Sequence, residues 1–270
     1  MREILAGGRI EAAEQEARWL VLAATGIDRG DLDESPEIGE GRAAIAEALA
    51  HRRVGGEPLQ YLTGVAGFRY LELAVGPGVM IPRPETEVLA ERAMARLPER
   101  GTVVDCGTGS GAIALSVAHE RPDANVFATE RSPVAMAWAE KNRAALGLEA
   151  RLIACDLLAG LPAELRRSID VVVANPPYVA TSEQEMLARD VVEHEPHEAL
   201  FAGPHGLDVI RRLAGEVPDW LRPGGWLVLE IGEKQADDVD ALLHAKGYAD
   251  VRIHPDLNSR PRIAEARAAS

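Results

Sequence analysis

Four consecutive residues, Asn175, Pro176, Pro177 and Tyr178, carry groups that could bind a planar amino group. They follow a short apolar run at 171–174 that is rich in valine, which predicts a buried strand. Proline cannot continue a sheet ladder, and the residue before it is held in an extended geometry, so we expect Asn175 at the end of the strand. Its amide would project into the crevice above the sheet, where open α/β folds bind their ligands. Taken alone, the four residues fit a proline-rich turn after a core strand equally well.

A second pattern, Asp-x-Gly-x-Gly-x-Gly at 105–111, lies between a predicted strand and a predicted helix. Glycines let the backbone approach a ligand closely and turn sharply into a helix. Glu130 ends the next predicted strand, where an acid can accept hydrogen bonds from both hydroxyls of a ribose. Asp156, after the third strand, could bind an adenine amino group. Because the spacing differs from the dinucleotide pattern G-x-G-x-x-G, the set favours S-adenosylmethionine over a nicotinamide dinucleotide.

The elements that would position these residues alternate between strand and helix after residue 85, which indicates a mostly parallel sheet with helices on both faces. The predicted strands are 102–105, 125–129, 150–154, 171–174 and 226–231, with weaker candidates at 248–253 and 262–266. The predicted helices are 85–96, one from the glycine loop to about 119, 133–146 and 235–245.

The first part of the chain, 1–72, has helical character, with a helix predicted at 42–53 and a loop at 28–36. The segment 55–64 is too rich in glycine for a regular element. Alternation at 68–75 predicts a strand or hairpin.

Three parts are therefore expected in the chain. They are a helical domain at 1–72, a hairpin linker at 73–84 and an α/β domain at 85–270. The last begins after the segment 81–87, whose two prolines predict an extended entry.

Composition narrows the function classes. The 270 residues are 47% hydrophobic and 27% charged, as in an ordinary globular protein, and the net charge of -14 disfavours direct nucleic-acid binding. No apolar run is long enough for a bilayer span, and no secretion signal is evident. Cys106 and Cys155 resemble core residues of a protein in a reducing cytoplasm, so we expect a cytoplasmic location.

Four segments together resemble the release-factor glutamine methyltransferase family, within the class I S-adenosylmethionine-dependent methyltransferases. They are GEPLQYLTG at 56–64, IPRPETE at 81–87, DCGTGSGAIALS at 105–116 and NPPYV at 175–179. Their order and spacing match the family over nearly the whole chain. The resemblance implies a Rossmann-like fold and methylation of the glutamine amide in the Gly-Gly-Gln motif of peptide chain release factors.

The resemblance also implies roles for individual residues. S-adenosylmethionine would be bound by Gly107, Thr108, Gly109, Ser110, Gly111, Glu130, Asp156, Leu157 and Asn175. Asn175, Pro176, Pro177 and Tyr178 would receive the glutamine and act in catalysis, and the helical domain would grip the release factor. Many relatives carry Asp at position 130, but the longer arm of Glu130 should still reach the ribose. Some relatives have an aromatic residue at position 157, so Leu157 would stack less well on adenine.

Two other functions remain compatible with these residues. Asn-Pro-Pro-Tyr also occurs in enzymes that methylate exocyclic amino groups of nucleic-acid bases, where two acceptors again hold a planar NH2 group. A non-enzymatic module that binds translation factors and retains a cofactor fold is the other alternative, and the intact glycine loop argues against it.

Several further charged residues have no clear role from the sequence. His194 and His197 could suggest a metal cluster, but Pro196 breaks a helix that would align them, so we expect a polar lip beside the active site and no metal. Arg83 could be solvated, contact the cofactor or order the domain junction. Arg212 is interpreted as part of a solvated helix face.

Overall fold

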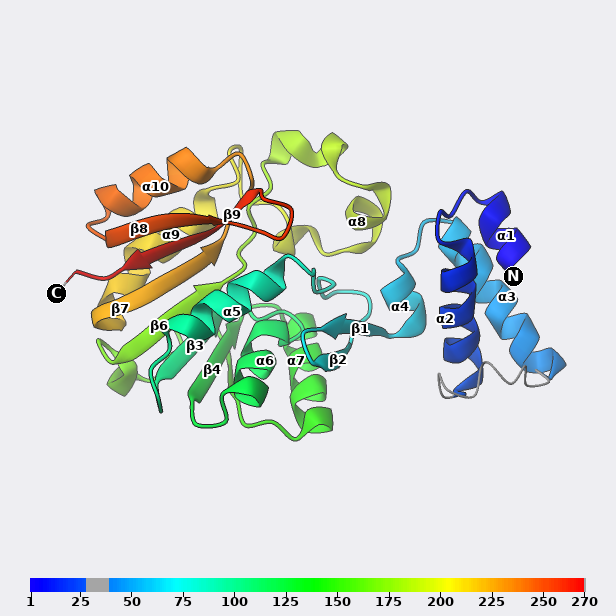
Figure 1. Ribbon diagram of the computed structural model, residues 1–270, viewed down its shortest axis with the longest axis horizontal. Coiled ribbons are helices and arrows are strands. Elements are labelled where there is room, and N and C mark those ends of the chain that lie inside the picture. Colours follow the sequence, from blue (N-terminus) through cyan, green and yellow to red (C-terminus); the bar gives the residue numbers. More distant parts are fainter. Residues whose placement is uncertain (28–38, 270) are drawn as a thin grey trace.

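The computed structural model describes residues 1–27 and 39–269. A small group of helices at the N-terminal end is joined through a short hairpin to a larger α/β part (Figure 1). The loop predicted at 28–36 lies outside the described residues. No helix in the described part of the chain is both long and apolar enough to cross a membrane.

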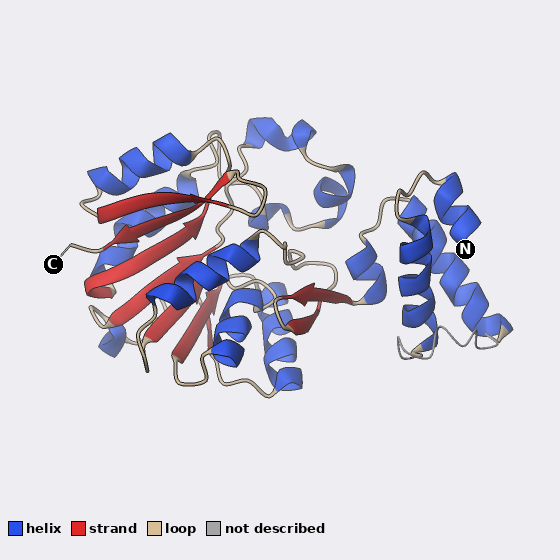
Figure 2. Cartoon of the chain, viewed as in Figure 1, coloured by secondary structure: helices blue, strands red, loops and turns tan. Residues whose placement is uncertain are grey.

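Within the described residues, seven strands form one sheet in the order β5-β4-β3-β6-β7-β9-β8 (Figure 2). The first five strands of this order are parallel, and β9 and β8 are antiparallel to their neighbours. Their bounds are β3 Thr102–Cys106, β4 Asn125–Glu130, β5 Arg151–Ala154, β6 Ile169–Ala174, β7 Leu221–Glu230, β8 Ala249–Pro255 and β9 Pro261–Arg267. The expected mostly parallel α/β sheet is confirmed.

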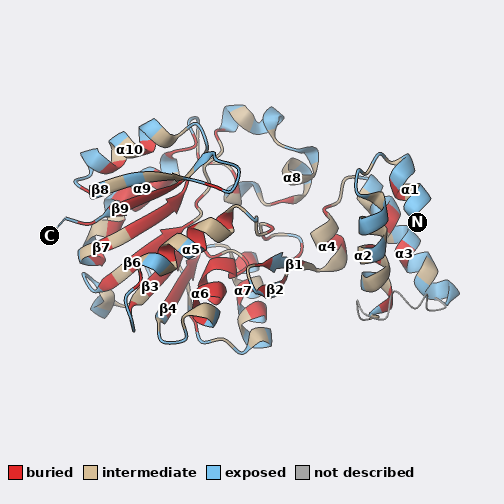
Figure 3. Cartoon of the chain, viewed as in Figure 1, coloured by how far each residue is buried: buried red, intermediate tan, exposed pale blue. Residues whose placement is uncertain are grey.

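Strand β6 shows why the sheet is buried on both faces. Val171 and Val173 belong to one hydrophobic cluster, whereas Val172 and Ala174 belong to another. Successive side chains of a strand point to opposite faces, so a continuous apolar run is stable only when helices cover both. Buried residues accordingly dominate the central strands in Figure 3, whereas the edge strands β5 and β8 are intermediate or exposed.

Helices from different parts of the chain cover the two faces. α5 and α6 contribute to the cluster of Val171, and α9 and α10 contribute to the cluster of Val172. The helices of this part are α5 Thr86–Arg96, α6 Ala112–Glu120, α7 Pro133–Leu146, α8 Arg189–His194, α9 Asp208–Glu216 and α10 Ala236–Ala245.

The N-terminal helices pack around a small core of their own. Leu5, Leu20, Ala50 and Leu62 are its buried members. The helices are α1 Arg2–Gly7, α2 Ala13–Thr25, α3 Glu40–Val54 and α4 Leu59–Thr63. α3 confirms the helix predicted at 42–53.

The prediction of no regular element at 55–64 is wrong, because α4 lies within it. Pro58 is the N-cap of this helix, and Gly64 follows it in the left-handed conformation with φ 78°. Glycine and proline here stand at the ends of a five-residue helix, where both are tolerated, and do not interrupt it.

The hairpin lies earlier than the predicted linker at 73–84. It consists of β1 Val65–Phe68 and β2 Leu71–Ala74, paired antiparallel with Phe68 opposite Leu71. The turn between them is Arg69 and Tyr70, and Arg69 has a φ of 51°. Two-residue hairpin turns usually carry Gly or Asn at such positions, so Arg69 and Tyr70 do not predict a turn.

Asn142 of α7 ties this hairpin to the glycine loop. Its side chain is buried, its Oδ1 accepts from Ala74 N at 2.7 Å, and its Nδ2 donates to Ala74 O at 3.0 Å and to Ser110 O at 2.9 Å. One side chain thus satisfies three backbone groups from two segments.

Replacing Asn142 by alanine should lower the free energy of unfolding by about 2–4 kcal/mol, because buried backbone groups would lose their partners. The matched control is Asn125→Ala, since Asn125 makes an exposed hydrogen bond to Arg100 O at 3.2 Å. The control should cost less than about 1 kcal/mol. Urea unfolding of both variants measures this, and equal losses would contradict the role assigned to Asn142.

Candidate functional site

A cleft opens at the carboxyl ends of the parallel strands, where ligands bind in open α/β sheets. Its walls come from the glycine loop after β3, the ends of β4 and β5, the turn after β6 and part of α9. Among the predicted site residues, the lining includes Gly107, Thr108, Gly109, Ser110, Glu130, Asp156, Leu157, Asn175, Pro176 and Pro177.

The glycine loop needs its glycines for two different reasons. Gly107 has a φ of 77°, and a Cβ placed on it would meet no atom within 4 Å, so the backbone borders open space. Gly111, the N-cap of α6, has a φ of 88°, and a Cβ there would lie only 2.8 Å from Cδ1 of Leu115 in the first turns of the same helix, so a side chain at this position would clash. The loop is held by Thr129 O, which accepts from the backbone N–H groups of Gly107 and Thr108 at 2.9 and 3.0 Å.

Asp105, on β3, stabilises this loop by hydrogen bonds. Its carboxyl is buried, and Oδ2 accepts from Thr108 Oγ1 at 2.6 Å and from Ala114 N at 3.1 Å. Oδ1 has no hydrogen-bond partner. Burial raises the pKa of Asp105 to about 7, although the two hydrogen bonds act to lower it.

Glu130 lies at the end of β4 beside the loop. Its Oε2 accepts from Gly109 N at 2.9 Å, and its Oε1 accepts from Ser132 N at 2.8 Å. A carboxylate can accept about four hydrogen bonds, so each oxygen keeps capacity for a further donor from the cleft. The geometry suits recognition of paired hydroxyls.

Asp156 and Leu157 form the adjoining wall. Asp156 is half-exposed and pairs with Arg212 of α9 at 2.8 Å. Arg212 lines the cleft too, so its interpretation as a solvated helix residue missed this contact. Leu157 has a φ of 48°, a backbone conformation uncommon outside glycine.

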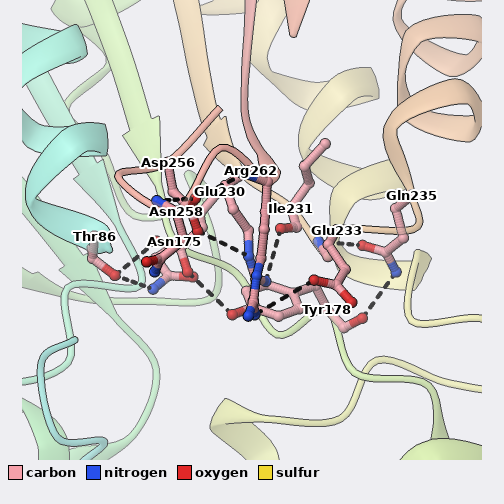
Figure 4. Close-up of polar contacts among 12 residues, drawn as sticks. Thr86, Asn175, Tyr178, Glu230, Ile231, Glu233, Gln235, Asp256, Asn258 and Arg262 are labelled. Carbon is pink, nitrogen blue, oxygen red and sulfur yellow. Dashed lines mark hydrogen bonds and ion pairs between the residues drawn. The ribbon is translucent and has the colours of Figure 1, made fainter. Parts of the chain in front are cut away.

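Asn175 and Tyr178 point to different partners. Asn175 lines the cleft, and its Nδ2 donates to Thr86 Oγ1 at 3.1 Å. Tyr178 turns its hydroxyl to Glu230 and donates to Oε1 at 3.1 Å, while Arg262 Cζ lies 5.6 Å from the centre of its ring (Figure 4). Burial raises the pKa of the Tyr178 phenol, which keeps it a donor.

Gln235 holds the backbone of the same turn. Its Nε2 donates to Tyr178 O at 2.9 Å, and its Oε1 accepts from Gly232 N at 2.8 Å (Figure 4). The turn after β6 is thus fixed from the start of α10.

Thr86 and Glu230 are the residues that the sequence interpretation missed. Thr86 Oγ1 donates to Glu230 Oε2 at 2.7 Å, and both side chains are buried. Burial raises the pKa of Glu230, while the Thr86 and Tyr178 hydroxyls and Arg262 act in the opposite direction. An acid at the end of the otherwise apolar stretch 226–231 was the available signal.

Arg83 orders the segment before α5. It forms an ion pair with the buried Glu195, whose Oε2 also accepts from Ile81 N at 3.1 Å. Of the three roles considered for Arg83, the structure supports the ordering one. Pro196 and Glu198 beside this pair line the cleft. Across residues 1–27 and 39–269, no group of three or more His, Cys, Asp or Glu side chains could hold a metal ion.

Comparisons of the sequence give consistent matches along the chain. The family model described as Methyltransferase small domain matches residues 84–213, and that described as PrmC N-terminal domain matches residues 1–64. A release factor glutamine methyltransferase of Streptomyces coelicolor is 42% identical over 270 residues, covering 98% of this chain and 94% of that protein. One of Moorella thermoacetica is 43% identical over 267 residues, covering 96% of this chain and 92% of that protein.

Solved structures with a similar fold include methyltransferases. A methyltransferase from Pyrococcus furiosus aligns with a TM-score of 0.56 at 18% identity, covering 74% of this chain and 90% of that one. The catalytic domain of hMettl16 in complex with the MAT2A 3′UTR hairpin 1 aligns with a TM-score of 0.59 at 16% identity, covering 73% and 74%. At such identities the likeness concerns the fold alone, and it confirms the expected Rossmann-like methyltransferase sheet.

The state of Asp105 predicts a pH dependence. Since its pKa rises on folding from 3.8 to about 7, the carboxyl stabilises the fold fully below about pH 4 and loses this contribution as the pH rises through about 7. The free energy of unfolding should therefore fall across this window by at most about 1.4 kcal/mol per pH unit from this group.

The variant Asp105→Asn should lack this slope. Urea unfolding of both proteins between pH 4 and 8 measures the difference, in which any constant cost of the substitution cancels. Parallel curves for the two proteins would contradict the raised pKa.

Proposed function

The chain belongs to the release factor glutamine methyltransferase family, and we propose that it transfers a methyl group from S-adenosylmethionine to the glutamine side-chain amide in the Gly-Gly-Gln motif of bacterial peptide chain release factors. The main support for this proposal is the similarity to release factor glutamine methyltransferases, which extends over both the helical N-terminal part and the methyltransferase part. The turn after β6 lines the cleft and would supply acceptors for an amide NH2 group.

The residues around the glycine loop fit S-adenosylmethionine. The space beside Gly107 admits a ligand against bare backbone, and Glu130 retains acceptor capacity for the ribose hydroxyls. Asp156 and Leu157 would border the adenine. When bound, this cofactor supplies an electrophilic methyl group on a sulfonium. The residues assigned to it that line the cleft are Gly107, Thr108, Gly109, Ser110, Glu130, Asp156, Leu157 and Asn175. Gly111, which ends the glycine loop, is assigned to it from the sequence.

The acceptor amide is held by the turn after β6. An amide nitrogen is a poor nucleophile because its lone pair is delocalised into the carbonyl. Asn175 Oδ1 and the backbone carbonyl of Pro176 would each accept one of its N–H groups, which leaves the lone pair facing the methyl group. Pro177 would stiffen the turn, and Tyr178 would pack on the flat amide. Most of the rate gain would come from holding the reacting atoms about 3–3.5 Å apart.

The two parts of the chain would have different roles. The N-terminal residues 1–72 would grip the release factor, and residues 85–270 would bind the cofactor and carry out the transfer. Since release factors act on ribosomes, the protein would work in the cytoplasm. Its net charge of -14 disfavours a nucleic-acid substrate.

The proposal is tested by the transfer of radiolabelled methyl from S-adenosylmethionine to a purified bacterial release factor. Parallel reactions use the Gln→Glu variant of its Gly-Gly-Gln motif and total RNA. Label on the release factor that disappears in the Gln→Glu variant supports the proposal. Label only on RNA would move the function to base methylation, and no label with cofactor still bound would favour a binding module.

Asn175→Ala should reduce turnover by about 100-fold or more, because one of the two acceptors for the amide is lost. Its affinity for S-adenosylmethionine should stay within about three-fold, since the other residues assigned to the cofactor, the glycine loop and Glu130 among them, are untouched. Steady-state kinetics and calorimetry measure the two quantities, with the exposed Asn125→Ala as control. Unchanged turnover in Asn175→Ala would rule out its assigned role.

A further inference from the structure

A chain of hydrogen bonds leads from two residues that line the cleft, Asn175 and Thr86, to the buried Glu230. It leads from Asn175 Nδ2 to Thr86 Oγ1 at 3.1 Å and from Thr86 Oγ1 to Glu230 Oε2 at 2.7 Å (Figure 4). Tyr178 Oη completes it at 3.1 Å from Glu230 Oε1. Thr86 is 4% exposed and Glu230 is 2% exposed, so water does not replace these partners readily.

The direction of each hydrogen bond in this series is determined by its neighbours. A carboxylate only accepts, and both oxygens of Glu230 face a hydroxyl, one from Thr86 and one from Tyr178. Thr86 has a single hydroxyl proton, which the 2.7 Å contact assigns to Glu230. Its oxygen can therefore only accept from Asn175, so the nitrogen of the Asn175 amide must face Thr86.

Arg262 acts to lower the pKa of Glu230, which burial raises. It comes from β9, its Cζ lies 5.6 Å from the Tyr178 ring centre, and its Nη1 donates to Ile231 O at 3.3 Å. Each oxygen of Glu230 also accepts from a hydroxyl, Thr86 on one side and Tyr178 on the other, which favours the ionised form. An ionised Glu230 cannot donate a proton back to Thr86.

We propose that Thr86 and Glu230 are positioning residues that fix which end of the Asn175 amide faces the cleft, an inference that rests on the proposed function. The two ends of an asparagine amide have nearly the same shape, so packing alone does not choose between them. With the nitrogen committed to Thr86, the oxygen is left for the N–H of the acceptor glutamine. A reversed amide would present N–H groups to N–H groups and would repel the substrate.

The orientation of the Asn175 amide also affects the preference for glutamine over glutamate. With Asn175 Oδ1 facing the cleft, a glutamate carboxylate in place of glutamine meets an acceptor and is refused. A reversed Asn175 would instead donate to that carboxylate. Loss of the hydroxyl at position 86 should thus lower both the turnover and the preference for glutamine over glutamate, and a purely structural role would not alter that preference.

The test compares Thr86→Val, which removes the hydroxyl at similar volume, with Thr86→Ser, which keeps it. Thr86→Val should lose about 10- to 100-fold in kcat, while its KM for S-adenosylmethionine stays within about three-fold. Thr86→Ser should stay within about three-fold of wild type in both. The ratio of release-factor dissociation constants, Gly-Gly-Glu variant over Gly-Gly-Gln, should fall by about ten-fold in Thr86→Val only.

Three outcomes would overturn the inference. One is a kcat and glutamine preference of Thr86→Val within two-fold of wild type. Another is an equal loss in Thr86→Ser, since the hydroxyl would then not be responsible. If Thr86→Val fails to bind cofactor, Thr86→Ala replaces it, and an unchanged glutamine preference there also refutes the role. No transfer by the wild-type protein would instead refute the proposed function, and this inference with it.

Discussion

The buried carboxylate of Glu230 is the constraint on which the arrangement of the cleft depends. A buried charge is costly unless hydrogen bonds and an opposite charge compensate it. Here three separate segments contribute. Thr86 at the start of α5 and Tyr178 in the turn after β6 each donate a hydrogen bond to the carboxylate, and Arg262 on β9 acts to lower its pKa. The hydrogen bonds to this one carboxylate therefore bring the segments together, and Asn175 is held beside them by its hydrogen bond to Thr86.

The parallel sheet explains why residues far apart in the sequence share one cleft. β3, β4 and β6 run in the same direction, so the loop at 107–111, Glu130 and Asn175 all follow carboxyl ends at one edge. Asn142 and the Arg83–Glu195 pair then attach the hairpin and the segment before α5 to that edge. The cleft is thus a product of strand direction and of a few buried polar side chains.

Local signals in the sequence predicted much of this arrangement. The apolar run ending at Asn175 and the glycine loop follow from periodicity and from the conformations that Pro and Gly allow. The Thr86–Glu230 contact was not predictable in this way, because it joins residues 144 positions apart and depends on α5 packing against β6 and β7. The hairpin turn at Arg69 was missed because it lacks glycine, and α4 was missed because Pro58 and Gly64 cap it.

Neutron diffraction from crystals of the perdeuterated protein would test the central claim most directly, because it locates deuterium and distinguishes nitrogen from oxygen. The account predicts the Thr86 hydroxyl deuterium on the line to Glu230 Oε2 and the Asn175 amide nitrogen facing Thr86. A Thr86 deuterium directed at Asn175, with the amide oxygen facing inward, would contradict it.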